Sequence, residues 1–190
     1  LLVTTLDDHG VDGCTALDCT LREAIDAANS VPGVNTITFA GGLAGTLTVS
    51  STLGSLPDIA SDLYLVGPGR DVIAIDGDGA VRVLSIYSGT VAISGLTLTG
   101  GNADADYNGG GGLFVESGVH LTADDLAVSA NTSKESGGGI RNHGVLTLTN
   151  IVFSGNTIDN TYTEGCCKGG AGIANDGILR MVDSQLVDNI

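Results

Sequence analysis

The chain of 190 residues has no tryptophan, one methionine, three prolines and only seven Lys and Arg residues. With 22 acidic residues its formal net charge is −15, so it has no basic patch to neutralise phosphates, and nucleic acids and anionic membrane surfaces are excluded as partners. No apolar run approaches the roughly 18 residues of a membrane-spanning helix, which excludes a helical membrane span. Aromatic residues make up 4%, so we expect a narrow core filled by Val, Ile and Leu.

Hydrophobic residues and glycine, in contrast, are abundant. The hydrophobic content of 42% argues against an acidic disordered tail, which would be poor in apolar residues. The 30 glycines follow no G-x-y period, so a collagen-like chain is excluded. The length is typical of one domain or slightly more. The composition therefore predicts an acidic globular protein punctuated by glycine.

One segment near the start has the pattern of a helix. Thr20 and Glu23 form a capping box, in which each side chain satisfies a backbone N–H of the other residue. Apolar residues at helical spacing follow, and residues 30–33 supply the stop signal. We expect a single helix here. Beyond it the sequence predicts short strands bounded by Gly, Asp, Asn or Ser, at 37–39, 46–49, 63–66, 72–75 and 81–84.

The second half of the chain contains an internal repeat. Leu113, Ile140 and Ile173 occupy equivalent positions, and each repeat ends in an asparagine, at positions 131, 156 and 189. The longest unit carries an insertion over residues 157–168. A unit of roughly 25 residues is too small to bury its own apolar face, so we expect the units to stack and the insertion to project as a loop. Stacking in register predicts a ladder of the three asparagines.

The four cysteines occur as two local pairs. Cys14 and Cys19 are close enough for a disulfide, which would indicate an oxidising compartment; free thiols or half of a metal site are the alternatives. Cys166 and Cys167 are adjacent, and the sequence leaves open a vicinal bridge, a bridge between chains or reduced thiols.

Residues 12–29 carry a resemblance to a known family. Their sequence, DGCTALDCTLREAIDAAN, resembles the N-terminal motif of the CSLREA family of secreted bacterial right-handed parallel β-helix proteins. Thr20 stands where that family usually has Ser, and it keeps the capping oxygen. Residues 93–102 are similar to the rungs of the same family. The resemblance implies a secreted or cell-surface scaffold. It implies no particular reaction, because many such proteins have no assigned activity.

Two later segments resemble a second group of proteins. Gly137–Ile140 and Phe153–Asn156 are similar to the GG-x-I and F-x-x-N repeats of polymorphic outer-membrane adhesins. The other rungs depart from the second motif, with Val128 and Leu186 in place of Phe. We therefore predict an all-β right-handed parallel β-helix, or solenoid. It comprises an N-terminal cap over residues 1–34, with a short strand and the helix, and rungs over residues 35–190.

The two ends of the chain also carry expectations. Leu1–Thr5 has neither a basic region nor a small-residue cleavage site, so it is interpreted as a mature or trimmed terminus. The sequence stops where a rung is completed, at Asp188–Ile190, and a continuation in a longer protein is expected.

Candidate chemical groups are scattered. A calcium-dependent polysaccharide lyase, the main enzymatic alternative on this scaffold, needs clustered carboxylates and a nearby cation. Its candidates are Asp76, Asp78, Asp104 and Asp106 with Arg70, Arg82 or Arg141, although Asp in D-G pairs is more typical of turns. Calcium could also bind Asp7, Asp8 and Asp12 through oxygen ligands. His9, His120 and His143 lie far apart, and His120 and His143 are interpreted as solvated turn residues.

These observations favour a structural function. We expect an extracellular structural or adhesive module without enzymatic activity or cofactor, calcium being the one candidate cation. Its rungs and the 157–168 loop would contact surface glycans, proteins or other copies of the chain. An exposed last rung would allow end-to-end association into a filament by strand addition.

Overall fold

The computed structural model describes residues 1–10, 12–103, 108–159 and 169–190. Cys166, Cys167, Asp104 and Asp106 lie outside the described residues, as does most of the 157–168 insertion. Within the described part the chain is mostly strand with one short helix, so the expected all-β class is confirmed. No helix of that part is long and apolar enough to cross a membrane.

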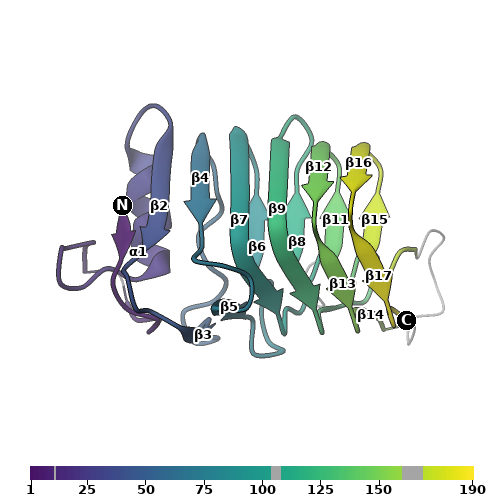
Figure 1. Cartoon of the computed structure of the whole chain (residues 1–190), viewed down its shortest axis with the longest axis horizontal. Helices are drawn as coiled ribbons and strands as arrows, with labels where there is room; N and C mark the ends of the chain where they lie inside the picture. The colour runs from purple at the N-terminus through teal and green to yellow at the C-terminus, as the bar shows by residue number, and fades with distance from the viewer. Residues whose placement is uncertain (11, 104–107, 160–168) are drawn as a thin grey trace.

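All strand pairs are parallel, and they form one large sheet and two smaller ones (Figure 1). The main path of the large sheet is β1 (Leu2–Val3), β2 (Asn35–Phe39), β4 (Leu63–Val66), β7 (Thr90–Thr99), β9 (His120–Ser129), β12 (Val145–Thr149) and β16 (Ile178–Val182). Its remaining members are β3 (Gly45–Thr48), β5 (Ile73–Asp76), β13 (Val152–Ser154) and β17 (Gln185–Val187). The four-stranded sheet, which we call the second wall, consists of β15 (Ile173–Asn175), β11 (Ile140–Asn142), β8 (Leu113–Val115) and β6 (Leu84–Ile86). The smallest sheet pairs β10 (Thr132–Ser133) with β14 (Thr157–Ile158).

The strands stack so that each layer repeats the one before it. Ile140 lies opposite Leu113 on one side and Ile173 on the other, which confirms the predicted repeat register. Apolar side chains of successive layers therefore lie above one another inside the stack. One such row runs through six layers, from Leu47 to Ile75, Leu98, Val128, Phe153 and Leu186. The first five are fully buried and Leu186, in the last layer, is 50% exposed.

Left-handed backbone conformations mark the corners of the stack. The first row of these residues has φ between 50° and 64°. It consists of Gly95 within β7, Asp125 within β9, Asn150 after β12 and Asp183 after β16. A second row of such residues follows, and it includes Ala130 and Gly155. The extra residue at the bend restores the inward-facing alternation of the next strand, since Leu148 and Phe153 are both fully buried on either side of it.

The asparagine ladder is confirmed. Asn131 and Asn156 are fully buried, and the Asn131 amide nitrogen donates to Oδ1 of Asn156 at 2.9 Å. Asn156 donates in turn to Oδ1 of Asn189 at 2.7 Å, and its nitrogen also reaches the Val128 carbonyl. A second ladder, which the repeat comparison did not predict, joins Asn142 to Asn175 at 2.6 Å.

Helix α1 (Leu21–Ser30) closes the N-terminal end of the stack, beside β1 and β2 (Figure 1). The capping box is present, because Thr20 accepts from the Glu23 backbone N–H and Glu23 accepts from the Thr20 backbone N–H. The buried face of the helix, with Leu21, Ala24, Ile25 and Ala28, joins the core at the first layer. The cap therefore covers apolar surface that the first strands would otherwise expose.

One predicted strand is displaced. The sequence predicted a strand at 81–84, whereas β6 spans Leu84–Ile86. The Val81 N–H donates to the Gly77 carbonyl in a turn, and the Arg82 side chain is held by the Gly109 and Gly110 carbonyls. Turn closure and these contacts outweigh the local β-propensity of the valines.

Candidate functional site

The N-terminal cap contains a buried ion pair. Both Asp8 oxygens accept from the Arg22 guanidinium at 2.8 Å, and one of them also accepts from the Ser50 backbone N–H at 2.7 Å. The other guanidinium hydrogens reach the Ser55 and Gly54 carbonyls. The Asp8 side chain is 2% exposed. The pair therefore ties the first segment, the helix and the 50–55 turn together, and its charges are neutralised locally.

Glu23 is the second buried carboxylate of the cap. One of its oxygens accepts from the backbone N–H groups of Asp12 and Gly13, and the other accepts from the backbone N–H and hydroxyl of Thr20. Burial alone would raise the pKa of this carboxyl. The backbone hydrogen bonds outweigh burial and lower the pKa to about 2.

Cys14 and Cys19 form a disulfide, which confirms the first of the alternatives for this pair. The bridge closes the short segment that directly follows the N–H donors of Asp12 and Gly13. It therefore helps to hold those donors against Glu23.

One group of side chains in the cap has the composition of a metal site. Ligand atoms of His9, Asp12 and Glu23 lie within 4.8 Å of one another. Both Glu23 oxygens, however, already accept two hydrogen bonds each, so a cation would have to displace backbone donors. The ring of His9 bonds to the Gly10 carbonyl and the Asp18 carboxylate, which raise its pKa. Asp8, a predicted calcium ligand, is committed to Arg22. The group therefore fits a hydrogen-bonded cap better than a metal centre.

Of the residues predicted for a lyase, Asp76, Asp78 and the three arginines lie in the part of the chain that the structure describes, and these do not gather at one place. Asp76 accepts from the Asp78 backbone N–H at 2.8 Å, which is the turn arrangement. Arg70 contacts Asp125 and donates to the Asn150 carbonyl at 3.0 Å, beside an open hollow of about 330 Å³. Arg82 is buried, and its guanidinium carbon lies 5.0 Å from the Phe114 ring centre. Each of these arginines supports local structure.

The second wall carries a mixed aromatic and charged surface. Tyr87, Glu116, His143 and Asp176 each follow a strand of this wall, and each backbone N–H donates to the preceding layer. Because these residues take the same place in four successive layers, they form one column, which we call the outer row. Next to it lies a parallel column on the outside of β8 and β11, which includes Phe114 and Arg141.

Contacts join the two columns. The Phe114 ring, 1% exposed, lies 5.6 Å from the ring centres of both Tyr87 and His143. Arg141 donates from Nε to His143 Nε2 at 3.2 Å and pairs with Asp176. His143 is thus held between an aromatic ring and a guanidinium, which corrects its interpretation as a solvated turn residue. His120 begins β9 and is exposed.

The sequence analysis missed the outer row because it aligned the repeats only on their apolar positions and their terminal asparagines. Extending the Leu113, Ile140 and Ile173 alignment by three residues gives Glu116, His143 and Asp176. The signal was therefore present in the repeat register.

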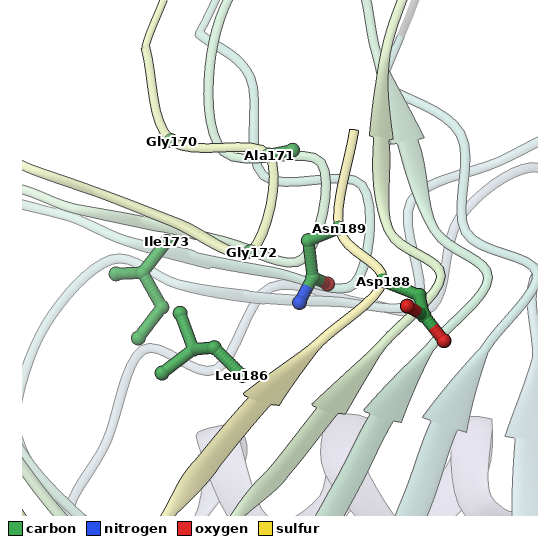
Figure 2. A pocket seen from close by; sticks show the side chains of 7 residues that line it. All are labelled: Gly170, Ala171, Gly172, Ile173, Leu186, Asp188 and Asn189. Atoms are coloured by element: carbon green, nitrogen blue, oxygen red, sulfur yellow. The ribbon is translucent and has the colours of Figure 1, made fainter.

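The last layer presents a different surface. A hollow of about 330 Å³ lies there between the segment Gly170–Ile173 and the strand end Leu186–Asn189 (Figure 2). Figure 2 shows Ile173 and Leu186 side by side with Asn189 above them. Ile178 and Leu186 are 66% and 50% exposed, so this layer leaves apolar residues uncovered in the described structure.

Comparison of the chain with protein-family models, with curated proteins and with solved structures found no match.

Proposed function

We propose that the chain is a right-handed parallel β-helix that serves as a secreted or cell-surface structural and adhesive module. The observation that carries the proposal is the parallel register that continues from β2 to β16, with one core row and an asparagine ladder inside it. Such a stack offers long, regular side walls to a partner. The Cys14–Cys19 disulfide supports an oxidising compartment. The resemblance of residues 12–29 to the CSLREA motif agrees with both statements.

A structural role is favoured over polysaccharide cleavage. Arg70, Arg82 and Arg141, the cations considered for a lyase, are engaged with Asp125, with backbone carbonyls and with Asp176, respectively. The strongly negative charge also opposes binding of polyuronates.

An adhesion assay tests the proposal directly. Beads coated with the folded chain are applied to surfaces that carry neutral polysaccharides, matrix proteins or more of the chain, and albumin-coated beads serve as the control. We expect retention on at least one surface above the albumin level. Retention on none of them would overturn the adhesive role.

An activity assay distinguishes the structural proposal from the calcium-dependent lyase. The chain is incubated with a panel of neutral and acidic polysaccharides, with calcium and with chelator, and new chain ends are measured. We expect none; cleavage that disappears in chelator would replace the structural proposal by the lyase.

Self-association is the second form of this proposal. The apolar residues of the last layer and the outer edge of β16 are suited to strand addition by a second copy. Sedimentation at increasing concentration should show dimers or longer species, and Leu186→Lys should reduce them. Val66→Lys, at an exposed valine of β4, is the control. A chain that stays monomeric throughout would overturn this form.

A further inference from the structure

We propose that the outer row, together with Arg141, binds a neutral, hydroxyl-rich glycan. The inference rests on the proposed adhesive function and names the surface and the ligand class that would perform it. It is carried by the aromatic, acidic and basic side chains that stacking brings to one place on the second wall.

Tyr87 supplies the apolar contact. Its side chain is 39% exposed, and its ring packs against the buried Phe114, which limits its motion. An aromatic face held in this way can stack on the C–H face of a sugar while its hydroxyl remains polar. Because the ring is already ordered, little side-chain entropy is lost on binding.

The polar groups along the outer row match the hydrogen-bonding chemistry of a sugar. A hydroxyl group both donates and accepts, so it needs acceptors and donors at close range. The carboxylates of Glu116 and Asp176 supply acceptors, and the Asp176 side chain is 55% exposed. Arg141 supplies donors, and its position is fixed by contacts with His143 and Asp176.

The balance of charge selects a neutral ligand. Arg141 is paired with Asp176 and the Arg82 guanidinium is buried over the Phe114 ring, so neither is an uncompensated exposed cation. The whole chain carries −15, so an acidic polysaccharide would be repelled. Among the residues that the structure describes, the group with the composition of a metal site lies in the N-terminal cap. It includes none of these side chains. A glycan bound directly, without a bridging cation, is therefore the occupant that the chemistry favours.

The length of the row fits an oligosaccharide. Neighbouring strands of a sheet lie about 4.8 Å apart, so four successive positions span about 14 Å along the stack. A ligand running parallel to the stack would meet Tyr87 at one end and the Arg141–Asp176 pair at the other. We expect a short oligosaccharide to bind more tightly than its monosaccharide.

The test is a titration followed by nuclear magnetic resonance of the labelled chain. The probes are hexamers of β-linked glucose, xylose and N-acetylglucosamine and of mannose, with hexagalacturonate as the anionic arm. We expect at least one neutral hexamer to shift the amide signals of residues 87, 116, 143 and 176. Tyr87→Ala should weaken that binding about tenfold, the loss expected for one stacking contact.

The matched control is Tyr64→Ala. Tyr64 is also an exposed tyrosine, at 49%, but it lies on β4 between Thr36 and Ala92 and away from the outer row. It should leave affinity within twofold of the unmodified chain. Circular dichroism and melting temperature of both variants show that any loss is not due to unfolding.

Three results would overturn the inference. These are no binding of any neutral hexamer, binding that Tyr87→Ala leaves unchanged, and binding of hexagalacturonate alone. If the bead assay still shows retention on protein surfaces or on the chain itself, the adhesive function stands and only the glycan site fails.

Discussion

Single residues at the corners show how the backbone limits the choice of amino acid. Gly155 has φ near 60°, and a Cβ placed there would contact nothing within 4 Å. Its requirement is therefore one of backbone conformation and not of space. Asp125 and Asn150 take the same conformation with side chains, and Asn150 donates to Asp125 at 3.2 Å. Asp and Asn tolerate this region better than most residues.

Gly155→Ala should lower the free energy of unfolding by about 1 kcal/mol, because an alanine in the left-handed region is strained. Gly41→Ala is the control, since Gly41 has open space and no left-handed backbone. It should change stability by less than about 0.5 kcal/mol. Urea denaturation of both variants measures the difference, and equal effects would contradict the role of the backbone.

Glu23 makes the stability of the folded chain depend on pH. Its pKa is about 2 in the folded chain and 4.5 ordinarily, so its contribution to stability is present above pH 4.5 and is lost as the pH falls toward 2. We expect that contribution to be about 3 kcal/mol. Melting temperatures between pH 7 and 2 should fall less steeply for Glu23→Gln, which cannot ionise. Parallel curves for the two proteins would contradict the assignment.

At the scale of the element, the asparagine ladder joins three layers through buried amides. Asn156 is its middle member: it serves Asn131 on one side, Asn189 on the other and the Val128 carbonyl. The last member, Asn189, is half-buried and has a neighbour on one side. An asparagine of the ladder is therefore expected to contribute more to the free energy of unfolding in a middle layer than in the last layer.

Asn156→Ala should cost about 3 kcal/mol, because it leaves several buried donors and acceptors unsatisfied. Asn189→Ala should cost about 1 kcal/mol, since water can replace the lost partners there. Chemical denaturation of the two variants gives the ratio. A cost at Asn189 equal to that at Asn156 would show that burial does not set the energy of the ladder.

The whole molecule is a stack in which each layer mainly contacts its neighbours. The N-terminal end is covered by α1 and tied by the Asp8–Arg22 pair and the disulfide, whereas the last layer exposes Ile178 and Leu186. Stability is then expected to be highest in the middle and to decrease toward the last layer.

Hydrogen exchange should show this gradient. Amides of β7 and β9 are paired on both sides and should exchange slowest, and those of β16 and β17 should exchange fastest. Mass spectrometry of peptides from each strand measures the order. Equal protection of β9 and β17 would indicate that the chain opens as one cooperative unit.

The sequence by itself determined the local features and the repeat. The capping box acts over three residues, and the equivalence of Leu113, Ile140 and Ile173 follows from a period that stacking must preserve. The asparagine ladder follows from the same period. These signals are readable because they depend on neighbours in the chain or on identical positions in successive units.

Only the tertiary structure decided which polar side chains meet. Asp8 finds Arg22 because the helix folds back over the first strand, and Arg82 displaces the predicted strand at 81–84 because the glycine carbonyls of the next layer lie within its reach. The positions of the outer row follow from the repeat register, but the contacts of His143 with Phe114 and Arg141 do not. Such pairs depend on side-chain reach across separate layers, which the order of residues along the chain does not reveal.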